Sequence, residues 1–339
     1  MIDSLSEFLE EWHSASPFMQ VHTSGSTGVP KTIIVEKKRM EASALMTCRF
    51  LNLNARDTAL LCMPLKYIAG KMIVVRSIVS GMRLVSVTPS SHPLAGIAEV
   101  PTFAAMVPMQ VASSVEVPEE LEKLKRIKHL IIGGGAVDER LASVLQTFPN
   151  NVWSTYGMTE TLSHIAMRRL NGAAADLFYT PMPEVKVWAN DERCLCIDAP
   201  QICDSVLTTH DIVEFAPDGK RFRILGRLDN VINSGGVKIQ TEEVEEVIKK
   251  VMANVWPEAT DGQSVSFAIT SKADAKFGEA VVMAIARGAL DGSSLQSLKE
   301  GIKESLPKYW QPKEYRIVDA IPLAGNGKIA RAKLKELIG

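Results

Sequence analysis

Short apolar runs alternate with amphipathic stretches along the first half of the chain. The runs TALLCMP (58–64), RLVSV (83–87), FAAMV (103–107), LII (130–132) and NVWSTY (151–156) have the length and composition of buried strands. Between them, apolar residues recur at helical spacing, and we expect helices over residues 39–50, 70–80 and 138–148. This alternation predicts an α/β fold with a mainly parallel sheet and helices packed on its faces.

Two helix starts carry capping signals. Near the N-terminus the apolar residues of a further helix repeat at helical spacing: Leu5, Phe8, Leu9 and Trp12. Ser4 and Glu7 in front of them fit a capping box. Asp138 is expected to cap the helix over residues 138–148, whose apolar face is formed by Leu141, Val144, Leu145 and Phe148.

The pattern changes near residue 184, where four short strands are separated by turns: EVKVWA, RCLCIDA, DIVEF and RFRILG. Such spacing predicts an antiparallel lobe or small barrel. After GRLDN an α+β unit follows, with a helix whose apolar face holds Val244, Val247, Ile248 and Val251, strands SVSFAIT and AVVMAIA, and a helix near 294–305. We therefore divide the chain into residues 1–228, a large α/β domain with this lobe, and residues 229–339, a small α+β domain.

Composition excludes several classes of protein. The 339 residues include 38 basic and 39 acidic residues, so nothing indicates a nucleic-acid partner. No apolar run has the length of a membrane span, and the acidic N-terminus is unlike a signal peptide, so we expect a cytoplasmic protein. The five cysteines form no CxxC pair; Cys194 and Cys196 alone do not make a zinc site, and reduced core thiols are the better interpretation.

A loop rich in glycine and hydroxyl residues, TSGSTGVPK, begins at Thr23. It lacks the spacing of a Walker A loop, and the residues after it, Thr32 to Val35, are typical of a strand. Any bound phosphate would then be held by loop amides, hydroxyls and Lys31, without a helix dipole.

This loop resembles the phosphate-loop signature of the acyl-adenylate-forming superfamily. Five further segments resemble that superfamily's motifs in the same order: residues 132–136 (IGGGA), 156–160 (YGMTE), 209–211 (THD), 226–229 (GRLD) and 325–328 (GNGK). The motifs span nearly the whole chain. The resemblance implies a large domain, a small mobile C-terminal domain, and activation of a carboxylic acid as its acyl-adenylate by ATP.

The resemblance also implies roles for single residues. The triphosphate would be held by Thr23, Ser24, Gly25, Ser26, Thr27, Gly28 and Lys31. Adenine would lie between Tyr156 and the stretch Gly134, Gly135 and Ala136, while Asp211 and Arg227 would contact the ribose. Glu160 would hold Mg²⁺ and Thr159 an α-phosphate oxygen. Lys328 would bridge the acid and the α-phosphate, because two anions that react need a cation between them.

A second half-reaction is implied as well. The small domain would rotate about Asp229, withdraw Lys328 and admit the thiol of coenzyme A. Residues 231–239 would form the loop along which the pantetheine enters, and its Gly235 and Gly236 leave room for a narrow tunnel.

Within the superfamily, the chain looks most like the o-succinylbenzoate–CoA ligases of menaquinone biosynthesis, on the segments YGMTETLSH (156–164), GGGA (133–136) and DNVINSGG (229–236). Such an acid carries a second carboxylate, which needs a cation or several hydrogen-bond donors. The candidates are Lys66, Lys71, Arg76, Ser163 and His164. Tyr67 stands where many relatives carry a residue that gates the acyl pocket.

One departure and several alternatives stay open. The phosphate loop follows only 22 residues, whereas family members usually carry a much longer segment before it. The resemblance then implies that the large domain is reduced, with a layer missing or shortened. The acyl pocket would be more open, or a second copy of the chain would complete it in a homodimer. The alternatives are another aryl- or fatty-acid ligase, a domain that loads a carrier protein, and a catalytically silent nucleotide-binding remnant. Glu160 and Lys328 argue against the last.

Overall fold

A computed structural model describes residues 4–22, 32–255, 267–288, 292–323 and 329–339. The chain forms two compact units, each treated by itself below. The first comprises Met1–Trp188, Cys196–Thr208 and Phe215–Arg223, and the second comprises Ala189–Leu195, Thr209–Glu214 and Ile224–Gly339. The functional boundary at Asp229 stays a prediction.

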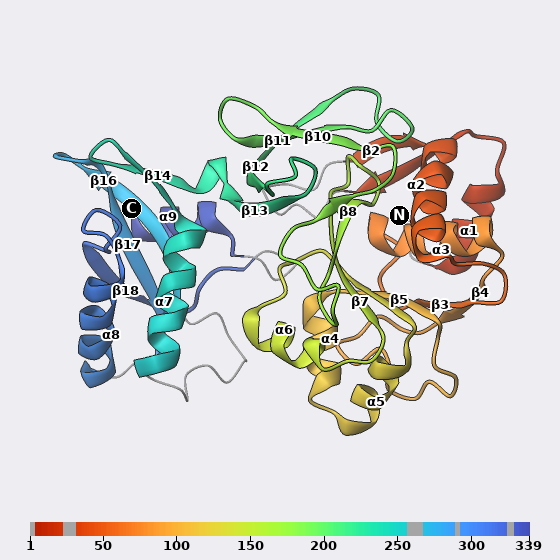
Figure 1. Cartoon of the computed structure of the whole chain (residues 1–339), viewed down its shortest axis with the longest axis horizontal. Helices are drawn as coiled ribbons and strands as arrows, with labels where there is room; N and C mark the ends of the chain where they lie inside the picture. The colour runs from red at the N-terminus through yellow and green to blue at the C-terminus, as the bar shows by residue number, and fades with distance from the viewer. Residues whose placement is uncertain (1–3, 23–31, 256–266, 289–291, 324–328) are drawn as a thin grey trace. The chain divides into compact units, whose positions relative to one another are not determined.

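The first unit is built on a seven-stranded sheet in the order β4-β3-β5-β6-β7-β8-β9 (Figure 1). Its strands are β3 (Thr58–Leu61), β4 (Arg83–Ser86), β5 (Phe103–Met106), β6 (His129–Ile132), β7 (Asn151–Gly157), β8 (His164–Arg169) and β9 (Thr180–Pro181). The neighbouring strands from β4 to β7 pair in parallel, β8 pairs antiparallel with β7, and β9 pairs antiparallel with β8. The predicted mainly parallel sheet is therefore confirmed.

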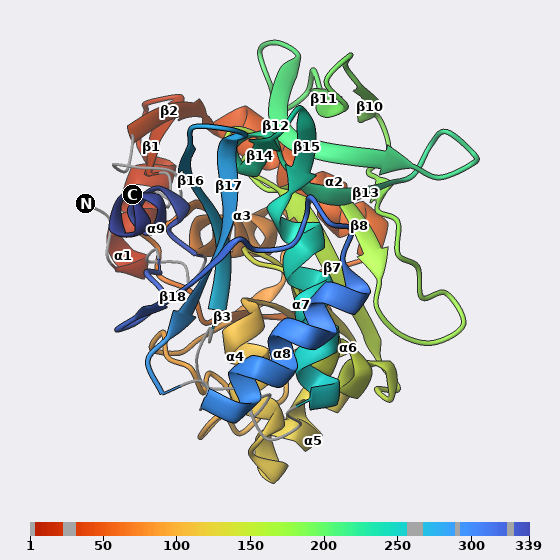
Figure 2. The ribbon, with the colours of Figure 1, turned by 90° about the vertical axis from the view of Figure 1, so that its left-hand side faces the viewer.

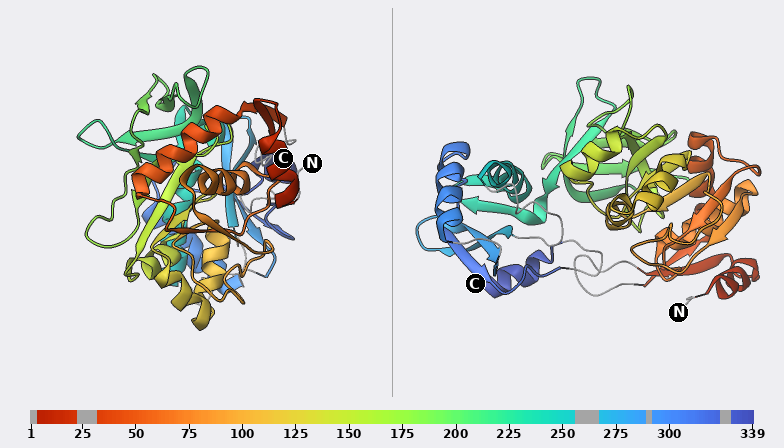
Figure 3. Two further views of the ribbon diagram at one scale, coloured as in Figure 1. Left: turned by 90° about the vertical axis from the view of Figure 1, so that its right-hand side faces the viewer. Right: turned by 90° about the horizontal axis from the view of Figure 1, so that it is seen from below.

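Helices cover this sheet: α1 (Leu5–His13), α2 (Lys37–Leu51), α3 (Ile68–Ser80), α4 (Pro108–Val115), α5 (Pro118–Arg126) and α6 (Glu139–Gln146). The predicted helices correspond to α1, α2, α3 and α6, and α2 lies beside α3 (Figure 3). Ser4 and Glu7 form the predicted capping box, and Asp138 accepts a hydrogen bond from the Leu141 amide. Helices α4 and α5 were not predicted because each spans fewer than ten residues, although the proline at the start of each was an available helix-start signal.

The strand β3 is shorter than the predicted run 58–64. The chain turns after Leu61 and brings the Pro64 carbonyl against Gly70 of α3, where an added Cβ would lie 2.5 Å from that oxygen. Gly70 is therefore needed for a close backbone approach. This contact fixes the start of α3, which carries Lys71 and Arg76.

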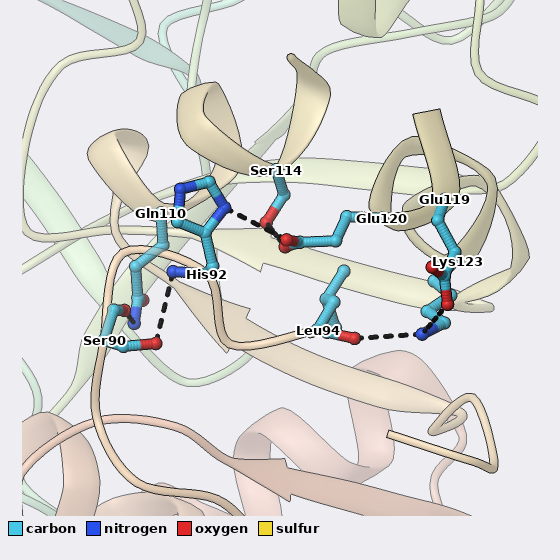
Figure 4. Close-up of polar contacts among 8 residues, drawn as sticks. All are labelled: Ser90, His92, Leu94, Gln110, Ser114, Glu119, Glu120 and Lys123. Atoms are coloured by element: carbon cyan, nitrogen blue, oxygen red, sulfur yellow. Dashed lines mark hydrogen bonds and ion pairs between the residues drawn. The ribbon is translucent and has the colours of Figure 1, made fainter. Parts of the chain in front are cut away.

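The long connection between β4 and β5 is held by side chains of α4 and α5 (Figure 4). Gln110 donates to the Ser90 carbonyl at 2.9 Å, and Lys123 donates to the Leu94 carbonyl at 3.2 Å. The buried carboxylate of Glu120 accepts a hydrogen bond from Ser114 at 2.7 Å and pairs with Nδ1 of His92 at 3.0 Å. Backbone carbonyls of this irregular connection thus accept hydrogen bonds from polar side chains.

The remaining strands that precede residue 228 form two smaller sheets. Strands β1 (Phe18–His22) and β2 (Thr32–Glu36) pair antiparallel on either side of the phosphate loop, and β2 confirms the strand predicted after that loop. Strands β10 (Lys186–Ala189), β11 (Cys194–Asp198), β12 (Leu207–Phe215) and β13 (Phe222–Arg227) form one sheet in this order, where four strands were predicted.

The second unit has its own sheet and core. Strands β14 (Val231–Ser234), β15 (Val237–Gln240), β16 (Phe267–Asp274), β17 (Gly278–Ala286) and β18 (Glu314–Val318) make its sheet, accompanied by η1 (Leu228–Asn230), α7 (Thr241–Val255), α8 (Gly292–Ser305) and α9 (Arg331–Ile338). Helices α7 and α8 lie side by side (Figure 2). The predicted apolar face of α7 packs into the core of this unit, with Val244 and Ile248 fully buried.

No helix among the described residues is long and apolar enough to cross a membrane. The five cysteines are buried, and none forms a disulfide. Buried thiols agree with the prediction that these residues belong to the core.

One ion pair ties three elements of the second unit together. Arg331, at the start of α9, donates to both carboxylate oxygens of Glu245 on α7, at 3.0 and 2.8 Å. It also donates to the Ile269 carbonyl on β16, while Glu245 accepts from the Ile269 amide. The side chains of Arg331 and Glu245 are only 21% and 10% exposed, so the pair is largely shielded from water.

We predict that Arg331→Ala weakens the second unit, since it leaves the Glu245 carboxylate buried and unpaired. The free energy of unfolding should fall by about 3 kcal/mol. Amide hydrogen exchange in β16 and α7 measures this unit separately. The matched control is Arg287→Ala, which removes a well-exposed pair with Asp319 and should leave exchange unchanged. Equal effects of the two substitutions would contradict the prediction.

Candidate functional site

The turn between β7 and β8 holds several predicted site residues of the first unit. The two strands pair antiparallel, with a register shift between Tyr156 and Gly157. Residues 158–163 connect them: Thr159 and Ser163 are half-buried, and Glu160 is exposed. The carboxylate predicted to hold Mg²⁺ is therefore accessible, and Mg²⁺ on phosphates commonly needs only one or two protein carboxylates. No group of three or more His, Cys, Asp or Glu side chains that could hold a metal occurs within the described ranges.

The predicted adenine-binding residues lie on two neighbouring strands. Gly134 and Gly135 follow the carboxyl end of β6, and Tyr156 stands near the end of β7, which pairs with β6 in parallel. Gly134 has a φ of +79°, a backbone conformation that favours glycine. The ring of Tyr156 packs edge-on against Phe222 at 5.4 Å between centroids. The carboxyl edge of parallel strands is where such folds commonly bind nucleotides.

Arg76 lies at the centre of a buried polar cluster in the first unit. Its guanidinium is 2% exposed, and its Nη2 donates to the hydroxyl of Ser163. Ser163 in turn lies 3.3 Å from Nδ1 of His164, whose Nε2 is 3.0 Å from the hydroxyl of Thr47 on α2. Two candidates for binding a substrate carboxylate, Ser163 and His164, are thus joined to a third, Arg76.

This cluster contains a cation without a counter-ion. Among the residues that the structure describes, no carboxylate pairs with Arg76, and its Nε has no hydrogen-bond partner. Burial lowers the pKa of Arg76 to about 10, so the guanidinium is still charged at neutral pH. Burial, and then the Arg76 charge, hold the pKa of His164 well below its usual value, so the imidazole is neutral. A buried positive charge without a partner is unfavourable unless an anion comes to it.

The other residues predicted to contact the acid lie at or just before the start of α3. Lys71 is 1% exposed, and its Nζ lies 5.5 Å from the ring centroid of Phe8 on α1. Tyr67 precedes the first residue of α3 and is 36% exposed, with Lys66 over its ring.

In the second unit, four charged or titratable side chains form a chain of contacts. Arg227 donates to Asp211 at 2.9 Å and to Asp229 at 2.8 Å, and Nδ1 of His210 lies 2.6 Å from the other oxygen of Asp229. Burial opposes ionisation of Asp229, but the hydrogen bonds from Arg227 and His210 outweigh it and lower its pKa. The structure thus brings together both residues predicted to contact ribose and the predicted hinge residue. His210 was not singled out from the sequence.

Gly235 and Gly236 form a two-residue turn between β14 and β15, with φ of +60° and +81°. Residues 231–239 are therefore a hairpin rather than the predicted loop, because consecutive glycines suit a tight turn of this kind. A Cβ on Gly235 would lie 3.1 Å from the ring of Phe277 and 3.7 Å from that of Tyr309. Lys313 lies 3.0 Å from the centroid of the Phe277 ring. These residues were not predicted as site residues from the sequence. The run KYWQPK (308–313), which mixes lysine with aromatic residues, was the available signal for Tyr309 and Lys313.

Several predicted residues lie outside the described residues: Thr23, Ser24, Gly25, Ser26, Thr27, Gly28, Lys31 and Lys328. Their assignments to the triphosphate and to the reacting carboxylate stay predictions. Ala136 is described and exposed beside Gly135.

We predict that His164 makes the first unit less stable in mild acid. Because the folded pKa lies below the unfolded value near 6.5, the unfolded state binds the proton first, and stability falls as pH drops through this value. The slope per proton is at most about 1.4 kcal/mol per pH unit. His164→Gln should therefore flatten the dependence of urea midpoints between pH 7.5 and 5. An unchanged slope would show that His164 is not buried as a neutral group.

Comparison with known proteins supports the family resemblance. A family model described as AMP-binding enzyme matches residues 6–193. The 2-succinylbenzoate–CoA ligase of Listeria monocytogenes is 27% identical over 97% of this chain and 72% of its own length. A variant of E. coli MenE with bound OSB-AMS is 25% identical, with a TM-score of 0.69, over 96% of this chain and 71% of that one.

A solved structure of similar length also matches. The acyl-CoA synthetase (AMP-forming)/AMP-acid ligase II-like protein of Dyadobacter fermentans is 32% identical, with a TM-score of 0.64, over 98% of this chain and 93% of that chain. The fold class predicted from the motifs, that of an adenylate-forming enzyme, is thereby confirmed. Since the family model covers more than half of the residues, the chain belongs to the AMP-binding enzyme family.

Proposed function

We propose that this adenylate-forming ligase activates 2-succinylbenzoate with ATP and transfers the acyl group to coenzyme A. In the first step a carboxylate oxygen of the succinyl arm attacks the α-phosphorus, and pyrophosphate leaves. In the second, the sulfur of coenzyme A attacks the acyl carbonyl, AMP leaves and the thiol proton goes to solvent. The product is 2-succinylbenzoyl-CoA, an intermediate of menaquinone biosynthesis.

The observation that carries this proposal is the buried guanidinium of Arg76, which has no carboxylate partner among the residues that the structure describes. The acid has two carboxylates, and only the succinyl one reacts, so the benzoate one must be held elsewhere. Arg76 lies in a buried site with the hydroxyl of Ser163 beside it, and charge-assisted hydrogen bonds to a carboxylate are strong and directional. A fatty acid or a simple monoacid would bring no anion there and would leave the buried charge uncompensated.

The neutral state of His164 supports the same assignment. A second cation beside Arg76 would repel it, whereas a neutral imidazole bonded to Thr47 and Ser163 orients the serine hydroxyl. Ser163 can then accept from Arg76 and offer its proton to the incoming carboxylate. Lys71, predicted for the same carboxylate, is a weaker candidate because its ammonium lies over Phe8.

At the nucleotide, each predicted residue would perform a stated task. Glu160 would hold Mg²⁺, whose charge neutralises the phosphates, and Thr159 would donate to the α-phosphate. Asp211 would accept from the ribose hydroxyls, with Arg227 fixing its orientation. Tyr156 would stack on adenine opposite Gly134 and Gly135. The phosphate loop and Lys328 would contact the triphosphate and the reacting carboxylate.

For the second step, the Gly235–Gly236 turn would admit the pantetheine of coenzyme A. Phe277 and Tyr309 flank this turn as apolar walls, and Lys313 supplies a cation for the phosphates of the same molecule. Asp229 would act as the hinge about which the small domain rotates between the first and the second half-reaction. A homodimer and a cytoplasmic location stay predictions.

The test of the substrate assignment is a comparison of two acids that differ by one group. We expect pyrophosphate release with 2-succinylbenzoate to exceed that with 3-benzoylpropionate, which lacks the benzoate carboxylate. Arg76→Met should lower kcat/KM for the diacid about 100-fold, from the loss of roughly 3 kcal/mol of charge pairing. The same variant should change kcat/KM for the monoacid by less than fivefold.

The control variant is Arg49→Met, which removes an exposed arginine from the neighbouring helix α2 and should alter neither acid. Equal losses on both acids with Arg76→Met would mean that Arg76 supports the fold rather than the substrate. Palmitate or benzoate turned over as well as 2-succinylbenzoate would remove the substrate assignment itself.

A second prediction concerns the division of labour between the half-reactions. Lys328→Ala should abolish pyrophosphate release, because no ammonium then offsets the repulsion between carboxylate and α-phosphate. The same variant should still form thioester from supplied acyl-adenylate and coenzyme A, since that step no longer joins two anions. Both rates are measured by chromatography of the products. Equal loss in both steps would exclude a role for Lys328 in the first step alone.

A further inference from the structure

The turn from β7 to β8 carries groups for both ends of the proposed substrate. Thr159 and Glu160, assigned to the phosphates and Mg²⁺, stand at its beginning, and Ser163, assigned to the distal carboxylate, stands at its end. Only two residues, Thr161 and Leu162, separate these groups along the chain. Neither residue has a role in the scheme above.

Thr161 is fully buried, and its hydroxyl spans the whole turn. Its Oγ1 accepts a hydrogen bond from the Met158 amide at 3.0 Å. The same oxygen lies 3.0 Å from the Met158 carbonyl and 2.7 Å from the Ser163 carbonyl, so its proton can be donated to either. One side chain therefore joins the first and last residues of the turn, and no water is needed to satisfy these backbone groups.

The turn is tight, which makes this link necessary. Leu162 has a φ of +61°, a left-handed conformation that costs a branched or bulky residue about 1–2 kcal/mol. Its side chain is 2% exposed, so burial holds it there. At Gly157, an added Cβ would lie 2.3 Å from the Ser163 carbonyl, which shows how closely the two ends of the turn approach each other. Such strain persists only where the surroundings enforce it.

We propose that Thr161 is a positioning residue for acid activation: its hydroxyl fixes the spacing between the phosphate-binding start of the turn and Ser163 at its end. The proposal rests on the proposed function. In the first half-reaction the succinyl carboxylate must meet the α-phosphorus while the benzoate carboxylate stays on Arg76 and Ser163. A shift of about 1 Å between these contacts can cost a factor of about 100 in rate.

The experiment compares two variants that differ in the hydroxyl alone. Thr161→Val keeps the shape of the side chain and removes the hydroxyl, leaving the Met158 amide and Ser163 carbonyl unpaired. Thr161→Ser keeps the hydroxyl. Both are measured by ATP–pyrophosphate exchange with 2-succinylbenzoate and with 3-benzoylpropionate, and by urea unfolding.

We expect Thr161→Val to lower kcat at least tenfold with both acids, because Thr159 and Glu160 move. It should also raise KM severalfold for the diacid only, because Ser163 leaves Arg76. Thr161→Ser should stay within threefold of the wild type in both constants. This split of kcat and KM, together with rescue by serine, is not expected of a residue that only supports the fold.

The matched control is Thr58→Val. Thr58 is a buried threonine whose hydroxyl accepts from the Thr102 amide at 2.9 Å. It begins β3, at the edge of the parallel strands opposite to the end of β7. Thr58→Val should lower stability without changing kcat or KM.

Three outcomes would overturn the proposal: unchanged kinetics in Thr161→Val, equal kinetic losses in Thr161→Val and Thr58→Val, or loss of the same size in Thr161→Ser. If Thr161→Val yields no folded protein, Thr161→Ala replaces it under the same criteria. Failure of the proposed function would give a different result: the wild-type protein itself would show faster ATP–pyrophosphate exchange with another acid than with 2-succinylbenzoate. The kcat comparison is repeated with that acid and still decides whether Thr161 positions the turn.

Discussion

The structure of the first unit depends on the cost of keeping the charge of Arg76 away from water. A guanidinium on a helix packed against a sheet needs either a carboxylate or a polar lining, and the described residues provide only the lining. Ser163 accepts one hydrogen bond, and Thr47 holds His164 as a neutral partner of that serine. The burial that lowers the pKa of both Arg76 and His164 also makes the site selective for an anion.

The backbone around this charge is arranged by close contacts rather than by long-range forces. Gly70 lets the Pro64 carbonyl approach α3, and Gly157 lets β7 and β8 close into a narrow turn. Both glycines lie within the elements that carry the polar cluster, so the positions of Arg76 and Ser163 follow from how near two stretches of backbone can come. Packing determines the geometry, and electrostatics determines which ligand fits.

Much of this could be predicted from the sequence, and the limits have physical reasons. The parallel strands could be predicted because a buried strand is almost wholly apolar, as LII at residues 130–132 illustrates. Candidate site residues were found through motifs, which fix residue types at fixed spacings.

What could not be predicted was the partnering of side chains between distant segments. Arg76 and Ser163 are 87 positions apart, and nothing local indicates that the arginine lacks an acid. His210 was not predicted as a site residue because its contact with Asp229 joins two segments 19 positions apart. The hairpin over residues 231–240 was read as a loop because two glycines weaken any strand pattern around them.

The bidentate pair of Arg331 and Glu245 has one more implication. All its atoms, with the backbone of Ile269, belong to the second unit, so the stabilisation that the pair provides is internal to that unit. Surface residues of this unit can then vary in evolution without loss of the buried pair that stabilises its fold.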